Sequence, residues 1–322
     1  MRAVIMRAFG PPRVLEPADW PPPVPGPGEV AVDVEFAGVT FVETQIRAGR
    51  SPRPEMLPAL PAILGNGVGG TVAATGAGVD RGLIGRRVVS SLSGTGGYAE
   101  RAVTAATRLI DVPAGVTMRD AVALLADGRT ALALADRAGL RPGETVLVEA
   151  AAGGVGTLLV QLARNAGARV VGLAGGERKL AVARELGADI AVDYRDSDWA
   201  DRVTGAAGGV DVVFDGVGGE VGRAAFGLLR PGGRFCAFGM ASGSFAPVTE
   251  ELANERQVTR LAGFAGDPAK LQGLAATALA EAAAGRIRPV IGQESPLARA
   301  ADAHAAIEAR KTTGKTLLTV RQ

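Results

Sequence analysis

The segment that most constrains the fold of this chain is residues 145–156, TVLVEAAAGGVG. Its first part, Thr145–Val148, has the length and β-branching of a buried strand. A glycine-rich turn follows, and then Leu158–Ala163, a pattern typical of a helix. A strand, a glycine turn and a helix open a dinucleotide-binding unit, where glycines let a diphosphate approach the helix N-terminus. Ala151 replaces the first glycine of G-x-G-x-x-G, so the motif by itself is weak and the flanking chain must supply the rest of the fold.

The chain around this segment alternates strands with helices, as a doubly wound parallel sheet requires. A helix is expected at 117–137, where Thr117 offers an N-cap. Further helices are expected at 178–186, 199–203, 221–229 and 268–284, and strands at 169–173, 190–192, 210–214, 234–238 and 258–264. This order predicts an α/β domain of the Rossmann type with a dinucleotide site.

The first third of the chain has a different pattern. A stiff proline-rich connector at 21–28 cannot join a central sheet, and short β segments with glycine turns follow. The tail at 315–320 is β-like again and is expected to return to this β-rich part. The sequence therefore predicts a discontinuous β-rich domain, residues 1–117 and 267–322, and a Rossmann domain at 118–266.

Composition excludes several classes of function. The net charge is only +2 and the 13 aromatic residues are few, so a nucleic-acid-binding surface is not expected. The chain has one cysteine and one histidine, which argues against a Cys/His zinc site. The cysteine, Cys236, lies in an apolar strand-like run, and the histidine, His304, is expected on a helix as a surface or packing residue. No apolar stretch approaches the roughly 18 residues of a membrane span, and a cytoplasmic protein is expected.

The choice of dinucleotide depends on the end of the second Rossmann strand, where an acid would hold the ribose 2′-hydroxyl of NAD. Residues 170–176, VVGLAGG, carry no acid there, and Arg178 and Lys179 follow shortly after. This pattern favours a 2′-phosphate and hence NADPH. The alternative is that both cations are simply the solvated first turn of a helix.

Motifs distributed over nearly the whole chain resemble those of one family. They are Pro25–Val30, Ala37–Val39, Gly97–Glu100, Leu140–Glu144, Ala150–Gly156, Arg184–Asp189, Asp211–Asp215, Leu229–Gly233 and Gly314-Lys315. As a set, they resemble the zinc-free quinone oxidoreductase (zeta-crystallin-like) branch of the medium-chain dehydrogenase/reductase superfamily. The resemblance implies a GroES-like β-rich domain beside the Rossmann domain, a cleft that binds NADPH, and a homodimer or homotetramer formed through the strand Val258–Phe264.

The resemblance also implies which residues contact the cofactor. Lys179 and Tyr194 match the contacts to the 2′-phosphate, and Thr130 matches a residue beside the nicotinamide. The remaining expected contacts come from the diphosphate turn, the strand ends and the C-terminal motif: Gly153, Gly154, Val155, Gly175, Val217, Phe238, Gly239 and Lys315.

Departures from the family concern the substrate side. Zinc-dependent relatives carry a cysteine and a Gly-His-Glu where this chain has Thr40 and Asn66-Gly67, so no metal site is expected. Zinc-free relatives usually have an asparagine at the position of Thr40, a tyrosine at that of Ser51, and a Gln-Gly-Leu-Thr type motif at 127–130, where this chain reads DGRT. Asp127 and Arg129 are either an ion pair or part of the substrate site.

The leading hypothesis is an enzyme that uses NADPH to reduce a quinone or an α,β-unsaturated carbonyl compound by hydride transfer. With neither a metal nor a histidine expected near the substrate, backbone N–H groups or the catalytic candidates Thr40, Asn66 and Arg129 must stabilise negative charge on the substrate oxygen. Two alternatives remain open: an enoyl reductase acting on enoyl thioesters in polyketide tailoring, and a non-catalytic NADPH-binding protein.

Overall fold

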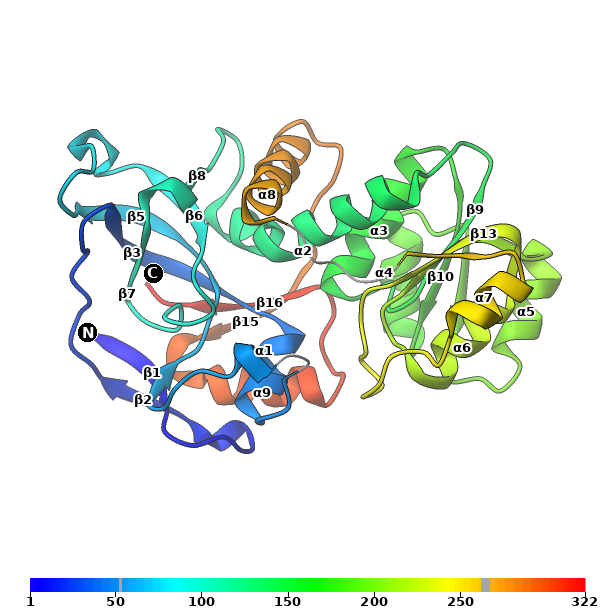
Figure 1. Cartoon of the computed structure of the whole chain (residues 1–322), viewed down its shortest axis with the longest axis horizontal. Helices are drawn as coiled ribbons and strands as arrows, with labels where there is room; N and C mark the ends of the chain where they lie inside the picture. The colour runs from blue at the N-terminus through cyan, green and yellow to red at the C-terminus, as the bar shows by residue number, and fades with distance from the viewer. Residues whose placement is uncertain (52–53, 262–266, 322) are drawn as a thin grey trace. The chain divides into compact units, whose positions relative to one another are not determined.

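The computed structural model of the chain describes residues 1–51, 54–261 and 267–321. These residues form two compact units, one comprising Met1–Ala126 and Ala275–Gln322, the other Asp127–Leu274 (Figure 1). The sequence places the corresponding boundaries at 117/118 and 266/267. The two helices α2 (Met118–Ala138) and α8 (Pro268–Ala283) each run across one of the observed divisions, so the chain passes between units within helices rather than in loops.

The main sheet of the first unit unites the N-terminal residues with the tail. Its strand order is β15-β16-β3-β5-β6-β8, and β7 also pairs with β3. The strands are β3 (Glu29–Val39), β5 (Gly67–Thr75), β6 (Arg87–Ser91), β7 (Arg101–Ala105), β8 (Ile110–Asp111), β15 (Ile291–Pro296) and β16 (Lys315–Thr319). The register pairs Thr316 with Val39 in antiparallel orientation, so the tail lies within the sheet of the first 126 residues.

Smaller elements complete this unit. A second sheet has the order β2-β1-β4, with β1 at Arg2–Met6, β2 at Leu15–Asp19 and β4 at Ala62–Ile63. Helix α1 spans Phe41–Arg47 and helix α9 spans Ala300–Glu308. Short 3₁₀ helices lie at Pro12–Val14, Pro54–Met56, Arg81–Leu83, Ala106–Arg108 and Leu297–Arg299.

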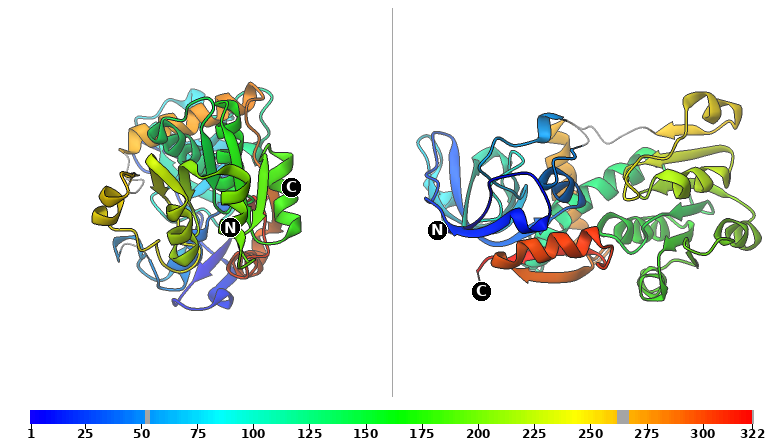
Figure 2. Two further views of the ribbon diagram at one scale, coloured as in Figure 1. Left: turned by 90° about the vertical axis from the view of Figure 1, so that its right-hand side faces the viewer. Right: turned by 90° about the horizontal axis from the view of Figure 1, so that it is seen from below.

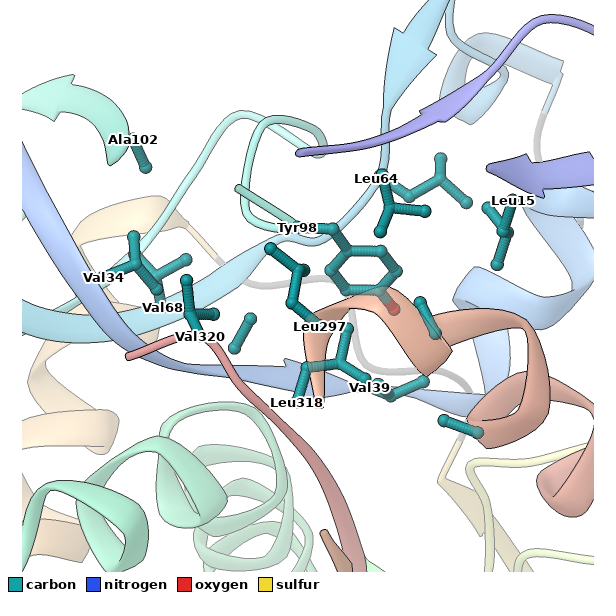
Figure 3. Packing of buried hydrophobic residues seen from close by; sticks show 14 of the residues in the cluster. Leu15, Val34, Val39, Leu64, Val68, Tyr98, Ala102, Leu297, Leu318 and Val320 are labelled. Carbon is teal, nitrogen blue, oxygen red and sulfur yellow. The ribbon is translucent and has the colours of Figure 1, made fainter. Parts of the chain in front are cut away.

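The core of the first unit surrounds Tyr98, which is fully buried. Its ring lies among Leu64, Leu297, Leu318 and Val39, which come from distant parts of the chain (Figure 3). Burial of each of these side chains contributes on the order of 1.5–3 kcal/mol. The same packing carries a phenol oxygen into the interior, where it needs a hydrogen-bond partner.

The second unit is a parallel sheet with the order β11-β10-β9-β12-β13-β14. Its strands are β9 (Thr145–Val148), β10 (Arg169–Ala174), β11 (Ile190–Asp193), β12 (Val210–Asp215), β13 (Leu229–Ala237) and β14 (Thr259–Leu261). The order reverses between β9 and β12, which places their carboxyl ends where α/β folds bind ligands. The predicted α/β fold class with a Rossmann unit is confirmed.

Helices cover both faces of this sheet (Figure 2). They are α3 (Gly154–Asn165), α4 (Glu177–Glu185), α5 (Trp199–Ala207), α6 (Gly219–Gly227) and α7 (Glu250–Glu255). Helices α5, α6 and α7 share one hydrophobic cluster, to which Trp199, Phe226 and Ala253 belong, whereas Leu180 of α4 packs with Ala152 and Ala174 in another.

Several predicted elements differ in extent from those observed. Helix α7 was not predicted, and β13 begins at Leu229 rather than at Arg234 because the Pro231-Gly232-Gly233 turn is part of the strand. Of the strand predicted at 258–264, β14 accounts for Thr259–Leu261, and residues 262–264 lie outside the described residues.

Candidate active site

The glycine turn of the second unit connects β9 to α3 and closes tightly. The N–H of Gly153 donates to the carbonyl of Ala150 at 2.7 Å, and the N–H of Thr157 donates to Gly153 O at 2.9 Å. A Cβ at Gly156 would lie 2.1 Å from the carbonyl oxygen of Ala150, so a side chain cannot be accommodated there. Gly153 caps α3 without a side-chain hydrogen bond in the described structure, and the first N–H groups of the helix can therefore face an anion.

An acidic side chain lies beside this turn. A Cβ at Gly154 would be 2.0 Å from Oδ2 of Asp127, so the carboxylate packs closely against the first residue of α3. Burial lowers the pKa of the Arg129 guanidinium, and attraction to Asp127 partly opposes that shift. Whether Asp127 and Arg129 form an ion pair or belong to the substrate site stays a prediction.

The turns after β10 and β11 lie together. The position of a Cβ at Gly175 would be 3.3 Å from the hydroxyl of Tyr194. The N–H of Gly176 donates to Oδ2 of Asp193 at 2.8 Å, and Lys179 lies half-buried in the first turn of α4. Gly175, predicted as a cofactor contact, and Lys179 and Tyr194, predicted as contacts of the 2′-phosphate, therefore follow neighbouring strands at one edge of the sheet.

Sequence reasoning missed a cation in this group. Arg195 donates to Asp193 through Nε at 2.9 Å and through Nη2 at 2.6 Å, while its side chain stays 62% exposed. These hydrogen bonds from Arg195 lower the pKa of Asp193 to about 2, although burial opposes the shift. The signal was available, because Arg195 lies two residues after the end of β11 and therefore at the ligand-binding edge of the parallel sheet.

The predicted contacts at the other strand ends gather around β12. Phe238 and Gly239 donate from their backbone N–H groups to the carbonyl of Asp215, at 2.9 and 3.2 Å. A Cβ at Gly239 would lie 2.5 Å from the carbonyl oxygen of Gly216. Val217 is buried in the same turn. Arg129 and Thr130, on α2, belong to this unit as well.

In the first unit, a buried carboxylate joins two of the catalytic candidates. Glu43, 2% exposed, accepts hydrogen bonds from the backbone N–H of Thr40 at 2.7 Å and from that of Asn66 at 2.8 Å. The side-chain oxygen of Asn66 accepts from the N–H of Gly94 at 2.9 Å, which leaves the Nδ2 of Asn66 as the donor side of the amide. Sequence reasoning missed Glu43, although the spacing Thr40-x-x-Glu43 is that of a capping box.

The network around Glu43 extends through the core of this unit. Tyr98 donates its phenol proton to Oε2 of Glu43 at 3.2 Å, and its oxygen lies 3.0 Å from Nε2 of His304. Burial raises the pKa of Glu43, while the N–H groups of Thr40 and Asn66 and the charge of Lys315 oppose this. Lys315, predicted to contact the cofactor, is itself buried and acts on Glu43. Its cofactor contact stays a prediction.

The two residues singled out for their rarity are both buried. His304 is fully buried on α9, so of the two expected roles helix packing is right and surface exposure is wrong. Cys236 is buried in β13 as expected, and burial raises the pKa of its thiol to about 12. Within residues 1–51, 54–261 and 267–321, no group of three or more His, Cys, Asp or Glu side chains could hold a metal ion. None of the described helices is long and apolar enough to cross a membrane.

Comparison with known proteins agrees with this architecture. Residues 26–114 match the model of the alcohol dehydrogenase GroES-like domain, and residues 154–281 match that of the zinc-binding dehydrogenases. A quinone oxidoreductase of Pseudomonas aeruginosa is 36% identical over 319 residues, which cover 97% of each chain. This chain belongs to the quinone oxidoreductase branch of the medium-chain dehydrogenase/reductase superfamily.

Two further members of the superfamily bear on chemistry. A 2-haloacrylate reductase of a Burkholderia species is 33% identical over 305 residues, 91% of both chains. The solved structure of a mycobacterial protein complexed with NADPH is 35% identical and superimposes with a TM-score of 0.89, covering 99% of this chain and all of that one. As a member of the quinone oxidoreductase branch, this chain departs from the zinc-binding relatives at Thr40 and Asn66, neither of which supplies a thiolate or an imidazole.

Proposed function

We propose that this protein is an NADPH-dependent oxidoreductase that reduces a quinone or an α,β-unsaturated carbonyl compound by hydride transfer, without zinc. The observation that carries the proposal is the glycine turn at the reversal of strand order, because this is where α/β folds bind dinucleotides. The names of the relatives agree with it: a quinone oxidoreductase, and a reductase of an unsaturated acid.

The residues present fit the cofactor. The uncapped N-terminus of α3 would receive the diphosphate, since a Cβ at Gly156 would collide with the turn and the N–H groups of Gly154 and Val155 lie at the start of the helix. Lys179 and Arg195, with the hydroxyl of Tyr194, would hold the 2′-phosphate. When bound, NADPH supplies the hydride.

The cofactor's remaining predicted contacts follow from the strand ends. Val217, Phe238 and Gly239 would line its path across the end of β12, and Thr130 would lie at the nicotinamide end. Gly153 and Gly175 permit close approach of the backbone to the diphosphate and the adenosine, respectively.

For catalysis, the chain must stabilise negative charge that develops on the acceptor oxygen. Asn66 is the best-placed candidate in its unit, because Gly94 fixes its side-chain oxygen and Glu43 fixes its backbone, which orients the Nδ2 donor. Thr40 is held by the same carboxylate and supplies a hydroxyl. Arg129, a residue of the second unit, stays a catalytic candidate because of its positive charge. Solvent supplies the proton.

Substitutions at these three residues test the assignment. Loss of one oxyanion donor costs roughly 3–4 kcal/mol, or about 10²–10³ in kcat. We expect such a loss for Asn66→Asp, which keeps the acceptor for Gly94 but removes the donor, and smaller losses for Thr40→Ala and Arg129→Ala. Asn165→Ala, at the exposed end of α3, is the control. If all three site variants turn over as fast as the wild type, the catalytic assignment is wrong.

The unsaturated acceptor deserves equal weight with the quinone because one relative is a 2-haloacrylate reductase. Enoyl thioesters belong to the same chemical class and form the alternative to be tested beside quinones and enones. Binding of NADPH without turnover of any acceptor would instead favour the non-catalytic alternative.

The assembly and location of the protein complete the proposal. Strand β14 lies at the edge of the described sheet and pairs with β13 on one side, which leaves its other side for the same strand of a second copy. We therefore propose a homodimer through the segment Val258–Phe264. We also propose that the protein is located in the cytoplasm. The oligomeric state in solution, measured by light scattering, tests the dimer.

A further inference from the structure

Two carboxyl groups meet beneath the ligand-binding edge of the parallel sheet. Glu149 directly follows β9 and Asp215 ends β12, and both are 0% exposed. The N–H of Glu149 donates to the carbonyl of Phe214 at 3.0 Å, which continues the pairing of the two strands and aligns the two acidic residues. They lie where the strand order reverses, between the glycine turn and the turn that follows β12.

The hydrogen bonds of this pair leave one buried oxygen of each carboxyl without a donor. Oε2 of Glu149 accepts from the N–H of Val217 at 3.0 Å, and Oδ1 of Asp215 accepts from the N–H of Gly218 at 2.6 Å. Oε1 of Glu149 and Oδ2 of Asp215 are buried and find no donor within the described residues, and the two residues directly follow Val148 and Phe214, which are paired across the adjacent strands. A proton shared between the two carboxyls would supply the donor that both of these oxygens lack.

The surroundings favour a single negative charge on the pair. Burial raises the pKa of Glu149 well above its ordinary value, and the neighbouring Asp215 raises it further. Burial also raises the pKa of Asp215. The largest effects on the pair come from burial, from the two carboxyls themselves and from the N–H groups of Val217 and Gly218. We therefore expect the pair to hold one proton and one negative charge, with Glu149, whose pKa is raised the more, as the favoured holder of the proton.

The pair holds the turn that the cofactor is proposed to cross. Val217, bonded to Glu149 through its N–H, accepts through its carbonyl from the N–H of Ser242 at 2.8 Å. The backbone of Asp215 accepts from Phe238 and Gly239. The side chain of Asp215 also packs on α6, because a Cβ at Gly222 would lie 2.7 Å from its Oδ2. Movement of either carboxyl would displace several of these contacts together.

We propose that Glu149 is a positioning residue of the cofactor site: it shares one proton with Asp215, and this shared proton holds the turn at Val217 in the conformation that binds NADPH. The inference rests on the proposed function. Loss of the proton would leave two anions in contact in the interior, and their repulsion would open the turn. The pair thus makes cofactor affinity depend on its protonation.

Glu149→Gln separates this role from a purely structural one. The glutamine has the shape of protonated Glu149: its amide donates to Asp215 and its oxygen accepts from Val217, but it cannot lose the proton. Glu220→Gln, an exposed residue in the first turn of α6, is the matched control. Glu149→Ala removes both hydrogen bonds and should weaken NADPH binding at every pH.

The experiment is a titration of each variant with NADPH, followed by cofactor fluorescence, from pH 6 to about pH 10. We expect the Kd of the wild type and of Glu220→Gln to rise with pH and to approach a tenfold increase per pH unit above the pKa of the pair. We expect the Kd of Glu149→Gln for NADPH to match that of the wild type within about twofold at pH 6 and to stay nearly constant as the pH rises. A parallel rise in Glu149→Gln, or a constant Kd in the wild type, would overturn the proposal.

A second readout keeps the inference separate from the proposed function. The folded protein favours the proton on Glu149, so the stabilisation it provides is complete below the ordinary pKa of a glutamate and is lost as pH rises through the raised value. Without cofactor, the Tm of the wild type should therefore fall relative to that of Glu149→Gln as pH increases. A difference in Tm between the two proteins that does not change with pH would contradict the shared proton. If the Tm difference changes with pH as expected but the protein does not bind NADPH, only the proposed function is refuted.

Discussion

The carboxylate of Glu43 accepts a hydrogen bond from the backbone N–H of Asn66 at 2.8 Å, across 23 residues of sequence. It also accepts from the N–H of Thr40, so one buried side chain fixes two segments that carry catalytic candidates. Tyr98 contributes a third donor. These three hydrogen bonds all come from donors and engage both oxygens of the carboxylate, so the site requires an acceptor at both positions.

Glu43→Gln should therefore destabilise the protein and impair turnover. In either orientation, the amide nitrogen of the glutamine faces a backbone N–H or the phenol of Tyr98. A buried donor left without an acceptor costs about 1–3 kcal/mol. Urea denaturation should show a loss of this size, and kcat should fall more than the affinity for NADPH. Glu16→Gln, on the exposed part of β2, is the control. Unchanged stability and kcat in Glu43→Gln would show that the carboxylate does not position these segments.

His304 should make stability depend on pH. Tyr98 donates to Glu43, so the Nε2–H of His304 must donate to the phenol oxygen, and the imidazole is neutral. Burial, assisted by the charge of Arg47, lowers its pKa to about 3. A lowered pKa contributes stability that is present above the unfolded value near 6.5 and is lost as pH falls toward 3.

The free energy of unfolding measured at pH 7 and at pH 5 checks this dependence. Between these values, His304 should account for about 2 kcal/mol of lost stability in the wild type. His304→Gln, which can still donate to Tyr98, should lack this component even if it is less stable at pH 7. The same pH dependence in both proteins would mean that His304 is protonated alike in the folded and unfolded states.

Asp127→Asn should strengthen NADPH binding. The carboxylate packs against Gly154 at the start of α3, where it opposes the approach of a diphosphate. Removal of this negative charge should make the binding free energy of NADPH more favourable by about 1 kcal/mol, which corresponds to a Kd on the order of fivefold lower. Asp136→Asn, exposed on the same helix, provides the control in the same fluorescence titration. Weaker binding in Asp127→Asn would show instead that the aspartate supports the cofactor site.

Lys179→Glu and Arg195→Glu should each weaken NADPH more than NADH, because the two cofactors differ only in the 2′-phosphate. For Lys179→Glu, the loss of one charge-assisted contact is expected to change the ratio of the two Kd values about tenfold, or ~1.4 kcal/mol. Arg178→Glu, exposed in the same turn of α4, should leave the ratio nearly unchanged. Equal effects of Lys179→Glu on both cofactors would refute the phosphate assignment.

The sequence was informative wherever local pattern determines structure. The strand and glycine turn at 145–156 appear as β9 and the start of α3, and the motifs identified the family that the comparisons confirm. The contacts of Glu43 with Tyr98 and of Tyr98 with His304 could not be predicted in this way. They join residues 55 and 206 positions apart, and such contacts follow from tertiary packing rather than from periodicity.

The contact between Glu149 and Asp215 is a second example of tertiary packing that the sequence does not predict. Both residues stand in motifs that the sequence analysis used, yet their contact depends on the register of β9 with β12. Arg195 follows the third Rossmann strand, whereas the residues that distinguish NAD from NADPH by sequence pattern follow the second. In each case, the sequence shows the type of the residue but not which residues it contacts in the fold.

The measurement that tests the central claim most directly is the oxidation of NADPH by the protein, in the presence of a metal chelator, with a panel of quinones, enones and enoyl thioesters as acceptors. The account predicts acceptor-dependent oxidation of NADPH that persists in the presence of chelator and exceeds the rate with NADH. Tight NADPH binding without oxidation by any member of the panel would contradict it.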